Sequence, residues 1–87
     1  RIAISDRGLE GLEGVFSLVV ANLRLPTLAR LAAAIAALTM PGGALVVSGV
    51  QQEEQAAVCA AYGRQRFECA WSVAEDRWVG LVLNKTG

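Results

Sequence analysis

Few side chains in this sequence could carry chemistry, and the most suggestive of them is Asn22. It directly follows an apolar run, Phe16 to Ala21, and in open α/β sheets ligands bind outside the carboxyl ends of the strands. The oxygen of its side-chain amide can accept a hydrogen bond, and its NH2 group can donate one. Alternatively, Asn22 closes the strand and caps the following helix, as asparagine often does. The sequence leaves both interpretations open.

The other chemically distinctive side chains favour structural roles. The chain has no histidine, and Cys59 and Cys69 form no CxxC pair, so no metal site is expected. We expect the two cysteines to be small apolar residues of the core, although a disulfide between them is possible. Trp71 and Trp78 are expected to pack the last hairpin on the helices, although they could instead line a substrate surface. Four acidic residues are interpreted as solvated charges: Glu53, Glu54, Glu75 and Asp76.

The composition limits the classes of function. With 87 residues, the chain can form one small domain, and its 54% apolar content suggests faces that other polypeptide covers. Eight basic and eight acidic residues give no net charge, which argues against binding nucleic acid directly. The most apolar stretch, 28–40, is shorter than the ~20 residues of a membrane span. Because charged residues Asp6 and Arg7 stand where a secretory signal would be apolar, a cytoplasmic location is expected. The start at Arg1 suggests a fragment or a processed product.

Patterns of apolar residues predict the elements that position these side chains. Helical spacing from Pro26 onward predicts a helix, apolar nearly all round and therefore heavily buried, which the Pro-Gly-Gly at 41–43 ends. A second helix is amphipathic, with Gly63 at its end. The predicted strands are 1–5, 16–21, 44–48, 67–73 and 78–83, the predicted helices are 26–40 and 52–62, and 6–14 is predicted to be a loop.

This order predicts a mixed sheet. Strands separated by helices become parallel neighbours, whereas the last two strands, joined by a tight turn at 74–77, must be antiparallel. Strands 16–21 and 78–83 are continuously apolar and should be covered on both faces, so the last strand should lie between 44–48 and its hairpin partner. That partner alternates and belongs at the edge, with Phe67, Cys69, Trp71 and Val73 on one face.

Three segments in this order resemble a known family. They are Ala21-Asn22-Leu23, the stretch from Leu38 to Gly49 that contains Pro-Gly-Gly and ends in Ser-Gly, and the Trp-containing final strand from Trp78 to Lys85. Together they are similar to the second half of class I S-adenosylmethionine-dependent methyltransferases, above all the ribosomal protein L-eleven methyltransferases. The chain departs from that family at Ser17, where an aspartate is common.

The resemblance implies that residues 1–87 form one partial domain, the C-terminal half of a doubly wound, Rossmann-like α/β sheet. It implies transfer of a methyl group from S-adenosylmethionine to a protein amine, a reaction that depends mainly on positioning. By resemblance, Asn22 contacts both cofactor and acceptor, and Leu23 and Pro26 contact the acceptor. Asp6 would lie near the adenine, or else be a solvated loop residue. The implied partners are a ribosomal protein and the N-terminal half of the domain. No association with a membrane is expected.

Two other hypotheses remain. One is half of a dinucleotide-dependent oxidoreductase, which would not explain the antiparallel last strand. The other is a small non-enzymatic α/β module that associates through an open strand edge. In the family's strand order, a strand absent from this chain lies beside 16–21, and 1–5 lies two strands away. An unpaired apolar edge is therefore expected at 16–21.

The missing cofactor turn gives a first prediction. No Gly-rich loop of the GxGxG type follows a first strand in this sequence, although such a loop usually holds the cofactor. We therefore expect the isolated chain to be inactive and to show no measurable S-adenosylmethionine binding by isothermal titration calorimetry. Saturable heat from the isolated chain would contradict this prediction.

Overall fold

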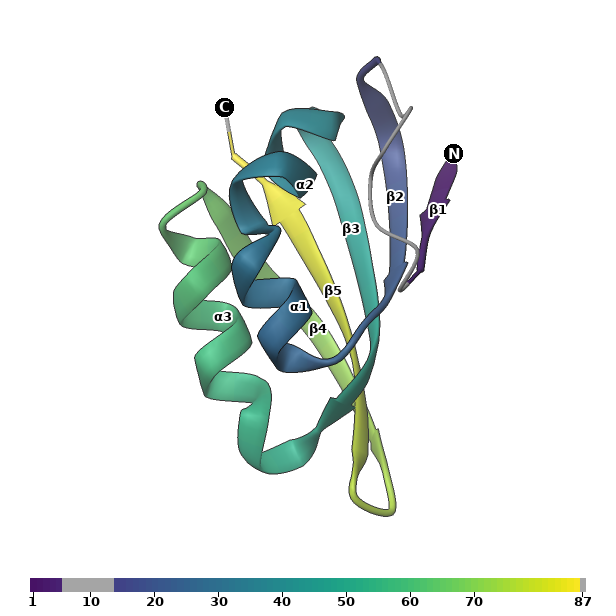
Figure 1. Ribbon diagram of the computed structural model, residues 1–87, viewed down its shortest axis with the longest axis vertical. Helices are drawn as coiled ribbons and strands as arrows, with labels where there is room; N and C mark the ends of the chain where they lie inside the picture. The colour runs from purple at the N-terminus through teal and green to yellow at the C-terminus, as the bar shows by residue number, and fades with distance from the viewer. Residues whose placement is uncertain (6–13, 87) are drawn as a thin grey trace.

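The framework of the described part of the chain is a five-stranded mixed sheet with the helices on one face (Figure 1). The computed structural model describes residues 1–5 and 14–86. None of the helices in these ranges is long and apolar enough to cross a membrane. The elements are β1 (Ile2–Ile4), β2 (Phe16–Asn22), α1 (Leu25–Arg30), α2 (Ala32–Leu38), β3 (Thr39–Gln51), a 3-10 turn (Gln52–Glu54), α3 (Gln55–Gly63), β4 (Phe67–Glu75) and β5 (Trp78–Lys85).

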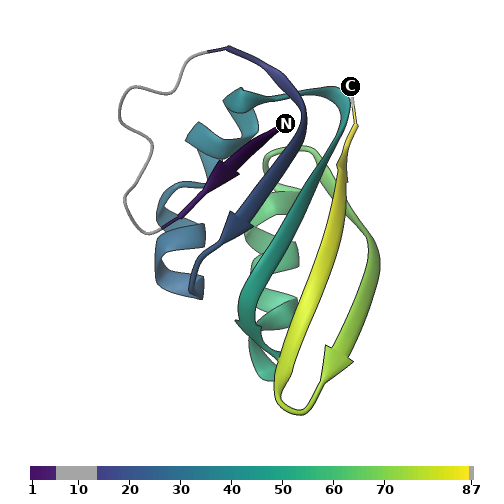
Figure 2. The same cartoon turned by 90° about the vertical axis from the view of Figure 1, so that its right-hand side faces the viewer.

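The strand order is β1-β2-β3-β5-β4. β1, β2 and β3 are parallel, whereas β5 runs antiparallel to β3 on one side and to β4 on the other. The predicted insertion of the last strand between β3 and its hairpin partner is therefore confirmed. The prediction that the apolar strands are covered on both faces is wrong for the described residues, because the helices lie behind the sheet in Figure 2. Leu18, Val20, Val46 and Val82 stay half-buried.

The amino-terminal strand is not where the resemblance implied. β1 pairs directly with β2, with Ile2 opposite Val19 and Ile4 opposite Ala21, instead of lying two strands away. Ile4 is only 3% exposed, so its burial holds this short strand in place. β1 therefore covers residues 19–21 of the strand edge that was predicted to be open, and for these residues the prediction is wrong. The predicted loop at 6–14 falls largely outside the described residues.

The helical segment after β2 is two short helices rather than one. Leu31, with φ −95° and ψ 7°, separates α1 from α2. One face is buried through Leu28 and Ile35, but four alanines at 29, 33, 34 and 37 are exposed, so burial on all sides was a wrong prediction. α2 ends at Leu38, and the Pro-Gly-Gly lies within β3.

The carboxyl end of α2 is held by Lys85. The Lys85 ammonium donates hydrogen bonds to the carbonyls of Ala36 and Thr39 at 2.6 and 2.8 Å, which satisfies this helix end.

Tyr62 links the helices to one another. Its side chain is fully buried, and its hydroxyl donates a 2.8 Å hydrogen bond to the Leu28 carbonyl at the end of α1. Its ring meets Phe67 edge-on, with 5.6 Å between ring centroids. Burial raises the pKa of Tyr62 above its ordinary value, because the phenolate would lose its hydration. The hydroxyl therefore stays protonated and remains a donor.

A bulge in β4 changes which way the hairpin side chains point. The register with β5 shifts between Cys69 and Trp71, so Trp71 lies opposite half-buried Val82 rather than on the face of Cys69. Trp71 is 61% exposed and Val73 51% exposed. The predicted common face of Phe67, Cys69, Trp71 and Val73 therefore holds only up to Cys69. The expectation that Trp71 and Trp78 pack on the helices is wrong, since Trp78 is also 42% exposed.

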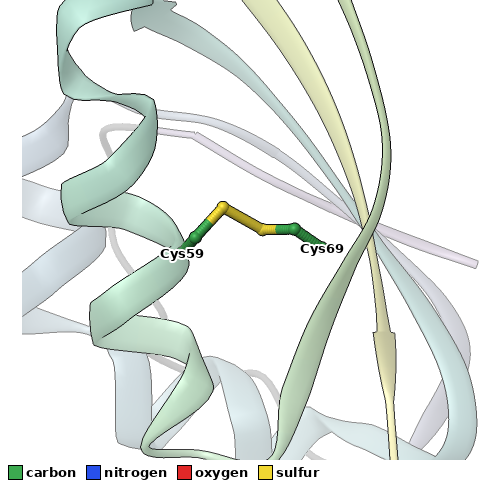
Figure 3. The surroundings of a disulfide bond; sticks show 2 residues. All are labelled: Cys59 and Cys69. Carbon is green, nitrogen blue, oxygen red and sulfur yellow. A yellow bond between two sulfur atoms is a disulfide. The ribbon is translucent and has the colours of Figure 1, made fainter.

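A disulfide joins Cys59 of α3 to Cys69 of β4 (Figure 3). The expectation of two separate core cysteines is therefore wrong. Cys59 is half-buried and Cys69 is exposed, so neither behaves as a small core residue. Their Cα atoms are 6.1 Å apart, because the first residues of β4 still face α3. Beyond Phe67, β4 is exposed along its whole length, and the disulfide fixes this edge strand to the helix layer.

Reduction of this disulfide should destabilise the protein. Closing a loop across a sequence separation of ten residues lowers the entropy of the unfolded chain, a stabilisation of about 3 kcal/mol. We therefore expect dithiothreitol to lower the free energy of urea unfolding by roughly that amount. The double variant Cys59→Ser/Cys69→Ser is the control and should respond to urea identically with and without reductant. An unchanged unfolding midpoint after complete reduction of the wild-type chain would contradict the prediction.

Candidate functional site

The candidate site lies at the edge of the sheet where β2 and β3 have their carboxyl ends. Asn22 is the last residue of β2 and lies opposite Ser48 of β3. The backbone continues this pairing, since the Leu23 N–H donates to the Ser48 carbonyl at 3.2 Å. Asn22 is exposed. Its amide therefore reaches the surface at the place where parallel α/β sheets bind ligands.

A cavity of about 520 Å³ opens beside Asn22. Its lining comes from four parts of the chain and consists of Ser5, Asn22, Leu23, Arg24, Thr27, Gly49 and Trp78. The structure thus brings together two of the residues proposed from sequence, Asn22 and Leu23. Leu23 is only 4% exposed, so most of its side chain belongs to the core.

Of the remaining sequence candidates, only Pro26 lies within the described residues, and it is not among the residues that line this cavity. Pro26 is exposed in the first turn of α1 and lines an adjoining, smaller cavity of about 230 Å³, which shares Arg24, Gly49 and Trp78 with the first. Asp6 lies outside the described residues, although the preceding Ser5 lines the Asn22 cavity. Their roles as binding residues stay predictions.

The helix-capping alternative for Asn22 is wrong. The residue that caps α1 is Arg24, and no side chain makes a capping hydrogen bond at that helix. Asn22 does end its strand, as expected. Because its amide is not used to cap the helix, it can serve a bound molecule.

Gly49 controls the space around Asn22, a role that was not inferred from sequence. Its φ is +87°, a left-handed conformation that favours glycine. A Cβ on this residue would lie 2.9 Å from the Asn22 side-chain oxygen and 3.2 Å from the Leu23 carbonyl oxygen. The Ser-Gly that ends the Leu38–Gly49 segment was the available signal, but only the fold shows which side chain Gly49 accommodates.

Trp78 is the second residue whose place in the site only the structure reveals. It begins β5 and lies opposite Gln51 of β3. It lines the Asn22 cavity and the smaller cavity near Pro26. Its aromatic ring can exclude water from a polar group bound there.

The chemistry available at this edge is positioning. Across residues 1–5 and 14–86, no group of three or more histidine, cysteine or acidic side chains could hold a metal ion. The cavity combines one amide, one guanidinium, two hydroxyls and apolar surface. Such a set can orient a ligand by hydrogen bonds and shield it from water.

The architecture defines the class of protein. Parallel strands that end in an antiparallel hairpin also occur in a crystal structure of a ribosomal protein L11 methylase from Lactobacillus delbrueckii subsp. bulgaricus. It superimposes with a TM-score of 0.81 at 23% identity, over 91% of this chain and 41% of that one. A methyltransferase from Pyrococcus furiosus gives a TM-score of 0.70 at 13% identity, over 87% of this chain and 44% of that one. The fold is that of class I methyltransferases.

Within this class, the sequence identifies the family. The family model "Ribosomal protein L11 methyltransferase (PrmA)" matches residues 2–86, and the chain belongs to that family. A relative from Geobacter sp. (strain M21), named Ribosomal protein L11 methyltransferase, is 47% identical over 85 residues. This match covers 98% of the chain and 27% of the relative. The chain thus spans about a quarter of the length of that relative and corresponds to its C-terminal part.

The close approach of Gly49 to Asn22 can be tested by substitution. We expect Gly49→Ala to displace the Asn22 amide and to lower the free energy of unfolding by about 1–3 kcal/mol, the cost of a strained backbone. The measurements are urea unfolding and the NMR shift of the Asn22 side-chain NH2 group. Gly63→Ala is the matched control, since a Cβ there meets nothing within 4 Å, and it should leave both unchanged or raise stability slightly. Equal effects of the two substitutions would contradict the inferred contact.

Proposed function

We propose that this chain is the acceptor-side part of an S-adenosylmethionine-dependent methyltransferase that acts on amino groups of a ribosomal protein. The observation that supports this most directly is the exposed Asn22 amide, which Gly49 accommodates at the carboxyl edge of the sheet in a chain of this family. A cytoplasmic location belongs to the same proposal, because a ribosomal protein is the substrate.

The residues of this edge fit one part of a cofactor site. The Asn22 amide can donate to a polar atom of S-adenosylmethionine, and the cavity of about 520 Å³ can accept a portion of that molecule. The usual Gly-rich turn is absent from the sequence, so the remaining contacts would come from other polypeptide. When bound, the cofactor supplies an electrophilic methyl carbon.

The residues of this chain would prepare the acceptor amine. The Asn22 side-chain oxygen accepts a hydrogen bond from the amine and so fixes the direction of its lone pair. Trp78 and the edge of Leu23 reduce contact with water, which favours the uncharged amine that the reaction requires. The substrate contacts of Leu23 and Pro26 and the cofactor contact of Asp6 are part of the proposal.

The two rival hypotheses have less support. The family match and the methyltransferase fold give no support to an oxidoreductase. The hypothesis of a non-enzymatic module requires an open strand edge at β2. It has less support because β1 pairs with the second half of that edge.

The proposal can be tested in a chimera. This chain would replace the matching C-terminal segment of the Geobacter methyltransferase, to which it is 47% identical, and transfer of labelled methyl groups to ribosomal protein L11 would be measured. We expect the chimera to be active and Asn22→Ala to reduce kcat/KM on the order of a hundredfold, as misplacement of a reacting group does.

Asn84→Ala provides the control for this experiment. Asn84 is also an exposed asparagine, but it lies opposite Ala44, towards the other end of β3. Its replacement should leave kcat/KM unchanged. A folded chimera that transfers no methyl groups, or equal losses in both variants, would overturn the proposal.

A further inference from the structure

A second cavity, of about 410 Å³, lies beside the β4–β5 hairpin. Its lining includes Gly49, Val73, Glu75, Trp78 and Gly80. Gly49 and Trp78 also line the cavity beside Asn22. The two cavities therefore adjoin along the same edge of the sheet.

The bulge in β4 creates one wall of this second cavity. Because the register shifts after Cys69, Val73 lies opposite Gly80 of β5. Gly80 has no side chain, and a Cβ there would come within 3.5 Å of a Val73 methyl carbon. The Val73 methyls therefore border the space above Gly80. On an unbulged strand Val73 would face the helices instead.

The other wall and the rim come from the hairpin turn. Glu75 and Trp78 lie opposite each other as the pair that closes the hairpin. Trp78 adds an aromatic surface that is 42% exposed, and Glu75 is exposed. The cavity thus combines aliphatic and aromatic walls with one carboxylate among its lining residues.

We propose that this second cavity binds a lysine or arginine side chain of a protein partner. The aliphatic stem of such a side chain fits between Val73 and Trp78, as long basic side chains commonly cover apolar surface. The cationic end is attracted by the Trp78 ring and by the Glu75 carboxylate. A phosphate or carboxylate ligand would be repelled by Glu75, and a purely apolar one would gain no attraction from that carboxylate.

This inference deepens the proposed function. The identification of the protein partner as the methyl acceptor rests on that proposed function. The first cavity would receive the amine to be methylated, and the second would receive a basic residue near it on the same polypeptide. Glu75, which the sequence suggested was only a solvated charge, would then select substrates with clustered basic residues.

An NMR titration of the 87-residue chain with the peptide acetyl-Ala-Lys-Ala-amide tests the second cavity directly. We expect saturable shifts of the Trp78 indole N–H. The Trp71 indole N–H is an internal reference, because Trp71 lies on the same hairpin and is 61% exposed but is not among the residues that line the cavity. A matched peptide with norleucine in place of lysine has a similar stem without the charge and should bind more weakly.

Two substitutions sharpen the test. Glu75→Gln should raise the Kd for the lysine peptide about threefold, the size of effect expected from an exposed ion pair. Glu68→Gln, at the other end of β4 and also exposed, should leave it unchanged. The proposal is overturned by the absence of saturable shifts, by equal shifts at both tryptophans, or by equal binding of the norleucine peptide. Because no methyl transfer is involved, these outcomes are independent of the chimera experiment.

Discussion

The pairing of β3 with a parallel strand on one side and an antiparallel strand on the other determines the rest of the structure. The parallel pairing with β2 brings Asn22 beside Ser48, and the antiparallel pairing with β5 brings Trp78 beside Gln51. The end of one strand and the start of another thus meet at one edge of the sheet. The buried residues of β3 that face the helices, Leu45, Val47 and Val50, hold this central strand in place through the hydrophobic effect.

Within residues 1–5 and 14–86 the helices lie on one face of the sheet, which gives the high apolar content a structural explanation. Val20, Val46 and Val82 lie opposite one another across three strands on the other face, and all three are half-buried. A row of this kind can contribute more burial when further polypeptide covers it. The Geobacter relative contains polypeptide beyond the matched part, since the match covers 27% of it.

One irregularity in β4 serves two purposes. Before the bulge, Cys69 faces α3 and forms the disulfide with Cys59. After it, Trp71 and Val73 lie opposite Val82 and Gly80 and point away from the helices. A bulge reverses the alternation of side chains because one strand contains an extra residue. One end of β4 is therefore linked to the helix layer by the disulfide, and the other end exposes its side chains on the opposite face of the sheet.

The sequence by itself determined the element order, the antiparallel insertion of β5 and the placement of Asn22 at a strand end, because these depend on local apolar patterns. It also carried the family resemblance, through ordered segments around Asn22 and Gly49. Only the tertiary structure decided the direct pairing of β1 with β2, the division at Leu31 and the disulfide. It likewise decided the exposure of the tryptophans and the contact between Gly49 and Asn22. Each of these depends on strand register or on which segments become neighbours, and local apolar patterns do not specify either.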